Sequence, residues 1–272
     1  MIDIFQLLLL GAIAGFTIFF GLPIGLLSAE PKLKNFLNAI ATGVLIFILF
    51  DVLEYAWKET TLSFETTINS NSYIFLFLMA LGLAIGLIGI AVYQSKFMTV
   101  KRNKVVEIDG SSESSPRKLD ISPSRLSLMI AIGIGVHNLS EGLAIGQSFA
   151  QGQINLALIL IIGFGLHNAT EGFGIVAPLV GDKKRPSITY LIKLGLIGGG
   201  PTFIGTLLGS FWVSSFLYVF FLALAAGALI YVILLINNTS SKNNYVPLIM
   251  TGIFIGLFAG FLTDLIITLA GA

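Results

Sequence analysis

Two copies of one short motif contain both histidines of the chain. The motifs are HNLSEG at residues 137–142 and HNATEG at residues 167–172. Residues four apart share one face of a helix, so the histidine and the glutamate of each motif point the same way. If the two faces meet, two imidazoles and two carboxylates converge, which suits zinc, ferrous iron, manganese or cobalt. The four candidate ligands are His137, Glu141, His167 and Glu171.

An asparagine follows each histidine. Asn138 and Asn168 are turned by about 100° from the histidines around the helix axis, so their amide oxygens are candidate ligands for an adjacent metal position. The chain has no cysteine, and any metal site must therefore use nitrogen and oxygen ligands. A single motif of this kind could equally well hydrogen-bond to a neighbouring helix. The matched pair of motifs favours a metal site.

The composition is that of a membrane protein. Hydrophobic residues make up 56% of the 272 residues and charged residues 11%, and the mean hydropathy is +0.94. A soluble domain has roughly a quarter of its residues charged. A carboxylate at the centre of a bilayer is costly unless it is paired or hydrated, and a divalent cation would offset that cost. The net charge of +1 gives no indication of a nucleic-acid partner.

Hydropathy predicts eight membrane-spanning helices. Their approximate ranges are 4–27, 36–57, 73–95, 124–150, 154–180, 187–210, 213–236 and 246–270. Long continuous apolar runs favour helices over barrel strands, which would show about ten residues of alternation. We therefore predict an all-α integral membrane protein with one transmembrane domain over residues 1–272. The polar segment 96–123 is predicted to be a flexible loop between the third and fourth helices.

The distribution of Lys and Arg predicts the orientation. Loops after the first, third, fifth and seventh helices carry almost all basic residues, and the opposite side holds only Lys58. Basic loops face the cytoplasm. We therefore expect the 96–123 loop to be cytoplasmic and both termini to lie outside, in a multi-pass protein of the plasma membrane.

Two internal similarities predict a repeat. IGIGVHN at 132–138 matches IGFGLHN at 162–168, and a weaker similarity relates ATGVLI at 41–46 to AAGALI at 225–230. The pattern suggests three helices, a central pair and three related helices. The second and seventh helices run in opposite directions, so this 3+2+3 repeat is inverted. Inverted repeats with a midplane site recur among secondary transporters.

Three further acids are candidates for an entrance. Asp51 and Glu54 lie at the outer end of the second predicted helix, and Asp264 lies towards the outer side of the eighth. They could attract cations towards the motifs, or they could be hydrated acids at the membrane surface. The sequence leaves both interpretations open.

The paired motifs resemble those of the ZIP family (Zrt-, Irt-like proteins) of metal transporters. Eight helices, outward termini, the long loop and the 3+2+3 repeat are similar as well, so the resemblance covers the whole chain. It implies transport of zinc, iron, manganese, cobalt or cadmium towards the cytoplasm, with no organic cofactor and no enzymatic activity. It also implies that the two histidines and two glutamates form the primary site, and that Asn138, Asn168 and Glu171 contribute to a second site.

Two of the chain's departures from the family pattern concern the site. The family often has proline before the motif glutamate, where this chain has Ser140 and Thr170. Any kink there must come from hydroxyl bonding to the backbone or from glycine. The family usually has a carboxylate on the sixth helix that completes the second site, where this chain has GGGPT at 198–202. We therefore expect a divergent member with one strong metal position.

Other functions stay open at this point. An intramembrane metal-dependent hydrolase would use the same ligands to activate water. A metal sensor would bind the ion without conducting it, and a transporter of another solute would use the metal only for structure or coupling. The expected partners are the metal ion and the lipid bilayer, with a homodimer left open.

Overall fold

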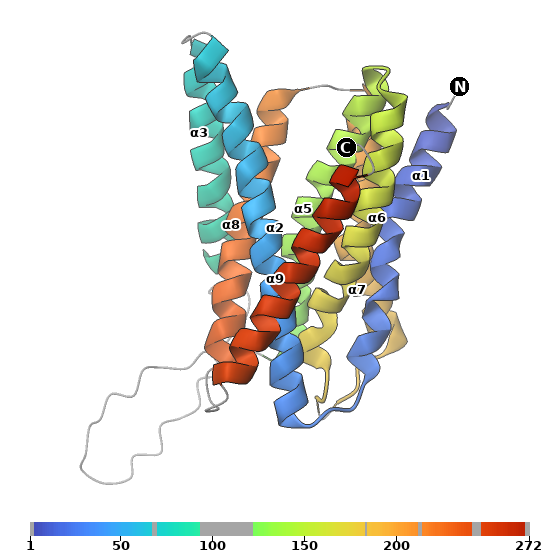
Figure 1. Ribbon diagram of the computed structural model, residues 1–272, viewed down its shortest axis with the longest axis vertical. Coiled ribbons are helices and arrows are strands. Elements are labelled where there is room, and N and C mark those ends of the chain that lie inside the picture. The colour runs from blue at the N-terminus through green and yellow to red at the C-terminus, as the bar shows by residue number, and fades with distance from the viewer. Residues whose placement is uncertain are drawn as a thin grey trace, which may run out of the picture.

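The computed structural model consists of helices throughout its described residues, which are 3–66, 70–92, 122–182, 184–211, 214–240 and 246–269. Eight of its helical segments are long and apolar enough to cross a membrane, which confirms the predicted eight-helix bundle (Figure 1). The α-helices are α1 (Ile4–Phe16), α2 (Pro31–Thr66), α3 (Ser70–Ala84), α5 (Pro123–Ala150), α6 (Ile154–Val176), α7 (Ile188–Phe211), α8 (Ser215–Ser240) and α9 (Val246–Leu269). Residues 96–121 of the predicted loop lie outside the described residues.

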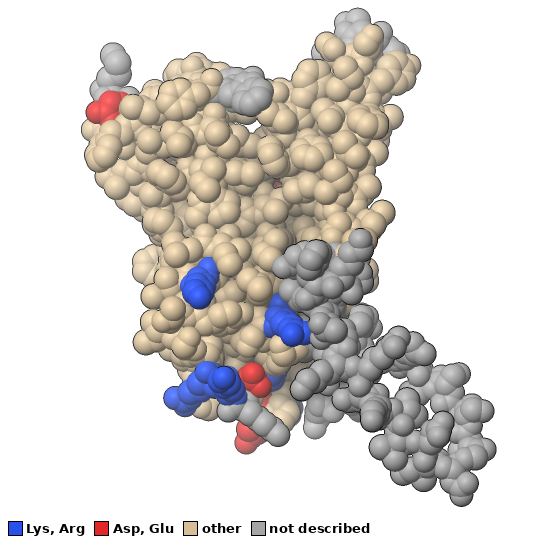
Figure 2. Space-filling view, turned by 180° about the vertical axis from the view of Figure 1, so that it is seen from behind, with Lys and Arg blue, Asp and Glu red and all other residues tan. Residues whose placement is uncertain are grey.

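Successive helices alternate in direction, so the N- and C-termini lie at the same end of the bundle (Figure 1). We call this the termini end, and the opposite end, where α2 and α5 begin, the loop end. Most described basic side chains gather at the loop end, as Figure 2 shows for one face of the molecule. Those nearest the loop-end connections are Lys32, Lys34, Arg125, Lys184 and Arg185.

Two membrane segments differ from the hydropathy prediction. Helix α2 extends well beyond the predicted 36–57, because its polar last turns remain helical. There the hydroxyls of Thr60 and Thr61 donate to the carbonyls of Ala56 and Trp57, at 2.8 and 3.0 Å. The first segment is not one continuous α-helix, since α1 is followed by the 3₁₀ helices η1 (Thr17–Phe20) and η2 (Leu22–Leu26).

A tight turn at residues 151–153 joins the two motif helices. Gly152 has φ 75°, a left-handed conformation that glycine adopts without steric cost. Its N–H donates to the carbonyl of Phe149 at 2.9 Å. The turn makes α5 and α6 antiparallel neighbours, which brings the centres of the two helices to a similar depth.

Helix packing agrees with an inverted repeat. In the predicted repeat α2 corresponds to α8 and α3 to α9, so the pair α2–α9 should have a counterpart in the pair α8–α3. Helix α2 packs on α9, α8 packs on α3, and α2 and α8 pack on each other. Gly43 and Gly227, which correspond in the weak sequence similarity, both lie at these contacts. A side chain at Gly43 would meet the backbone of α9 at Gly256, and one at Gly227 would meet the backbone around Gly86 in the π-helix η3 (Ile85–Gly89).

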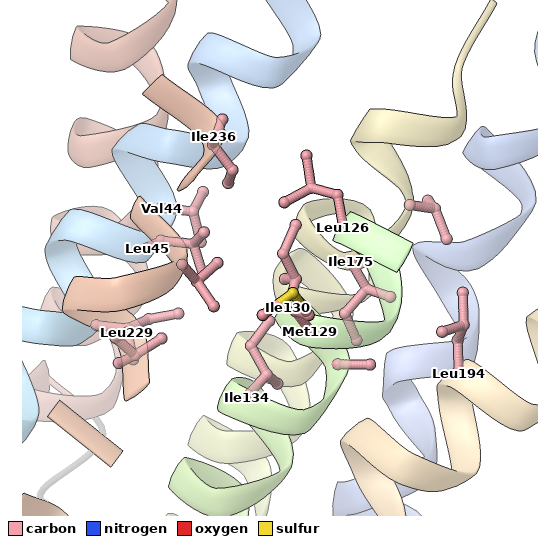
Figure 3. Packing of buried hydrophobic residues seen from close by; sticks show 14 of the residues in the cluster. Val44, Leu45, Leu126, Met129, Ile130, Ile134, Ile175, Leu194, Leu229 and Ile236 are labelled. Atoms are coloured by element: carbon pink, nitrogen blue, oxygen red, sulfur yellow. The ribbon is translucent and has the colours of Figure 1, made fainter. Parts of the chain in front are cut away.

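A large buried apolar cluster fills the loop half of the bundle. Figure 3 shows side chains of α2 and α8 facing those of α5, with α6 and α7 behind. The labelled members are Val44, Leu45, Leu126, Met129, Ile130, Ile134, Ile175, Leu194, Leu229 and Ile236. On α5 the cluster ends at Ile134, one turn before the first motif, so its α5 members lie between that motif and the loop end. On α2 and α8 the cluster continues past this level to Val52 and Leu222, which line the cavity described below.

Candidate metal centre

The structure brings the four predicted ligands together near the middle of α5 and α6. His137 Nε2 lies 3.4 Å from Glu141 Oε1 and 3.7 Å from Glu171 Oε1. His167 Nε2 lies 3.6 Å from the same oxygen of Glu171. Ligand atoms of His137, His167 and Glu171 all lie within 4.8 Å of one another. This spacing allows one ion to contact all three residues, with Glu141 beside His137.

The converging atoms are buried and lack hydrogen-bond partners within the described part of the chain. Glu171 is fully buried, and the other three candidate ligands are at most 4% exposed. The unpartnered atoms include Nε2 of both histidines, Oε1 of Glu171 and Oε2 of Glu141. Buried polar atoms almost always have a partner. Nitrogen and oxygen atoms that face one another without other partners fit a cation between them.

Each motif asparagine turns its amide nitrogen towards a neighbouring helix. Asn138 Nδ2 donates to Glu171 Oε2 at 2.9 Å and to the carbonyl of Gly198 on α7 at 3.0 Å. Asn168 Nδ2 donates to the carbonyl of Ala14 on α1 at 3.0 Å. The amide oxygens of both residues are buried without a partner. Both asparagines therefore lie at the site, and their role as ligands stays a prediction.

Ser140 and Thr170, which stand where the family often has proline, form hydrogen bonds with the backbone. The Ser140 hydroxyl donates to the carbonyl of His137 at 2.6 Å, and the Thr170 hydroxyl donates to that of His167 at 2.7 Å. The expected back-bonding is therefore present in both motifs. Such bonds occupy the carbonyl oxygen of each histidine and help to fix the turn that carries the ligands.

A cavity of about 430 Å³ leads to the centre from the termini end. Its inner wall includes His137, Glu141 and His167, and its outer wall includes the exposed residues Tyr55 and Lys58. The site is therefore reached from the end of the bundle that carries both termini.

Two of the three predicted entrance acids line this cavity. Asp51 and Asp264 belong to its wall, whereas Glu54 is exposed and does not line it. Sequence reasoning missed Tyr55 and Tyr218, which also form part of the wall. Tyr55 lies one helical turn after Asp51, and this i+4 spacing is a signal that could have identified it.

A comparison with known families covers both motifs. Residues 96–268 match a family model described as ZIP Zinc transporter. The chain belongs to the ZIP family. No curated protein matches it significantly. As a ZIP protein it is a multi-pass membrane transporter whose substrate is a divalent metal ion.

Glycines allow the helices of this ZIP protein to approach closely around the motifs. Side chains at Gly135, Gly142 and Gly146 would meet the backbone of α7, and one at Gly172 would meet Ile18 in η1. Small residues have this role in many membrane interfaces. Gly174 has open space instead. Close packing is therefore the role of some motif glycines and not of all.

The α7 segment expected to lack a second-site carboxylate contains a buried hydroxyl. Thr202 is fully buried, and its Oγ1 has no partner among the described residues. Sequence reasoning did not single it out, although it is the first polar side chain after three glycines and Pro201. The three glycines and Thr202 place only neutral groups on this stretch of α7.

Proposed function

We propose that this ZIP protein carries a divalent transition metal from the termini side, through the His/Glu centre, to the cytoplasm at the loop end. The observation that carries the proposal is a cavity that ends on His137, Glu141 and His167 while an apolar cluster fills the path beyond them. A carrier needs a binding site that is open to one side of the membrane at a time. This arrangement is that of a carrier open towards the termini side.

Zinc is the first candidate substrate. Two imidazoles and two carboxylates suit zinc as well as iron, manganese, cobalt and cadmium. The description of the matching family names zinc, which supports testing it first. The neutral α7 segment supports a single strongly held ion, because no further carboxylate from that segment would balance the charge of a second one.

The direction of transport follows from the proposed orientation. The described basic residues at the loop end support a cytoplasmic location for that end, by the positive-inside rule. Both termini and the open cavity would then face outwards, and transport would run inwards across the plasma membrane. The proposed activity involves no catalytic step, so the protein would not be an enzyme.

Asp51 and Asp264 are proposed to concentrate cations at the cavity entrance. Negative side chains on the wall of a narrow, low-dielectric cavity raise the local concentration of cations. Glu54 is exposed outside the cavity wall. We therefore assign the entrance role to the two aspartates only.

Metal uptake into proteoliposomes tests the proposal. Purified wild-type protein should load vesicles with radioactive zinc, and His167→Ala and Glu171→Ala should each abolish saturable uptake. Glu65→Gln, a change at an exposed acid near the end of α2, is the matched control and should retain uptake. Wild-type uptake in both site variants would contradict the proposal.

A further inference from the structure

We propose that Asn138 acts as a positioning residue, which holds the candidate ligand Glu171 through its amide N–H group, and that Asn168 has the corresponding place in the second motif. This inference rests on the proposed function, because it concerns the geometry of the same metal centre. It differs from the ligand role that the family resemblance implies. The hydrogen bonds of the two side chains carry it.

The environment of Asn138 fixes which end of its amide faces the site. Its nitrogen lies 2.9 Å from Glu171 Oε2 and 3.0 Å from the carbonyl oxygen of Gly198. A main-chain carbonyl can only accept a hydrogen bond, and so can a carboxylate. A flipped amide would place its oxygen against both of these acceptors, so the nitrogen must occupy this position.

The hydrogen bond from Asn138 determines how Glu171 is presented. Oε2 of Glu171 is occupied by the amide, while Oε1 faces both histidines at 3.6 and 3.7 Å and has no other partner. One carboxylate oxygen is therefore held by the protein and the other is left for the ion. A donor next to a ligating carboxylate commonly sets its orientation in this way.

Asn168 repeats the arrangement across the inverted repeat. Its amide donates to the carbonyl of Ala14 on α1 at 3.0 Å, as the amide of Asn138 donates to the carbonyl of Gly198 on α7. The two anchoring carbonyls occupy corresponding places. Gly15, which follows Ala14, and Gly199, which follows Gly198, each pack against the carbonyl oxygen of the other. Asn138 thus connects the glutamate of the opposite motif with α7, and Asn168 connects its own motif with α1.

A neutral donor is the appropriate group at these positions. An aspartate in place of Asn138 would direct carboxylate oxygens at Glu171 and at the carbonyl of Gly198, where like charges and unpaired acceptors repel. An asparagine that acted as a ligand would tolerate the same change, because a carboxylate oxygen binds a divalent cation at least as well as an amide oxygen. Replacement by aspartate therefore separates the two roles.

Cobalt binding to the full-length protein tests the inference. Co²⁺ would be titrated into wild type, Asn138→Asp, Asn168→Asp and Asn138→Ala, and its visible absorption band recorded, because band position and intensity report coordination geometry. We expect about 10- to 100-fold weaker binding in all three variants, the range typical of lost outer-shell partners, together with a changed band. Asn38→Ala, which alters a buried asparagine on α2 remote from the motifs, should bind like wild type.

The possible outcomes separate the two proposals. Asp variants that keep or tighten Co²⁺ binding with the wild-type band would overturn the positioning role and leave the metal centre intact. The absence of a Co²⁺ band in wild type would overturn the metal centre and the positioning role together. Asn138→Ala introduces no charge, so it keeps the test decisive if an Asp variant does not fold.

Discussion

Glu171 connects the two halves of the metal centre. Its Oε1 lies 3.7 and 3.6 Å from the Nε2 atoms of His137 and His167, and its Oε2 accepts a hydrogen bond from Asn138 of the other motif. A fully buried carboxylate of this kind is expensive in a membrane unless a cation or several donors compensate it. In the proposed metal centre, both helices would therefore contribute ligands to one ion.

The entrance role of the two aspartates predicts a change in substrate capture. Asp51→Asn and Asp264→Asn should each raise the KM for zinc uptake by about 3- to 10-fold and leave kcat nearly unchanged, because they remove local attraction and no ligand. The effect should shrink at high salt, where screening weakens the field of wall charges. Uptake kinetics at two ionic strengths provide the measurement.

Two further acids of α2 serve as references for this prediction. Glu54→Gln removes a charge that lies outside the cavity wall, and Glu65→Gln removes an exposed one near the helix end. Both should leave KM unchanged. A rise in KM for either variant equal to that of Asp51→Asn would show that general surface charge, and not the cavity wall, attracts the ion.

The spacing of residues predicted the ligands but not the contacts that surround them. The i+4 relation within each motif and the antiparallel helices were sufficient to place His137 and Glu171 in one centre. The direction of the Asn138 amide depends on the Gly198 carbonyl, 60 residues away. The buried Thr202 hydroxyl depends likewise on how α7 packs. Such features arise from tertiary contacts that no local pattern contains.

At the scale of helices, the packing of α5 on α7 depends on glycines. A methyl group at Gly142 would meet the carbonyl oxygen of Thr202 and lie 2.8 Å from the nitrogen of Thr206. Both atoms belong to the backbone, so α7 itself would have to move. Gly142 thus allows α7 to approach the motif of α5 closely.

Gly142→Ala should therefore destabilise the protein. Overpacking of a close contact costs about 1–3 kcal/mol, and we expect the unfolding temperature in detergent to fall by several degrees. Gly174→Ala is the matched control, because a methyl group there would meet no atom within 4 Å, and it should be neutral or slightly stabilising. Equal unfolding temperatures for the two variants would contradict the proposed role of Gly142.

The helices themselves were largely predictable, and their ends were less so. Eight apolar runs indicated eight membrane segments, and the turn at Gly152 was recognisable from its residues. Hydropathy could not show that α2 continues through Lys58 to Thr66, because polar residues that leave the membrane can remain helical. It also could not distinguish α-helix from the 3₁₀ turns of Thr17–Phe20, since the mean hydropathy of a segment does not depend on its helix type.

At the scale of the whole molecule, the two halves of the bundle differ. The termini half contains the cavity, and the loop half contains the fully buried side chains of Ile130, Ile134 and Leu229. The proposed carrier function would require this apolar cluster to separate while the cavity closes. The contact surface between α2 and α8 on one side and α5 on the other is where that separation would occur (Figure 3).

Thiol labelling can test this asymmetry, because the chain has no cysteine of its own. Ala144→Cys, at a half-buried position in the cavity wall, should react with a membrane-impermeant reagent applied from the termini side. Ile130→Cys should react at least about tenfold more slowly, since Ile130 is fully buried and a buried thiol is inert. Zinc should slow the reaction at Ala144→Cys. Equal rates at both positions would contradict a closed loop half.

X-ray absorption at the zinc edge tests the central claim most directly. Purified wild-type protein loaded with one equivalent of zinc should show only nitrogen and oxygen neighbours at about 2.0–2.2 Å, with the outer-shell scattering of two imidazoles. His167→Ala should show one imidazole, and Glu65→Gln should match wild type. Zinc that is bound in wild type without imidazole scattering, or that keeps two imidazoles in His167→Ala, would contradict a metal centre formed by His137 and His167.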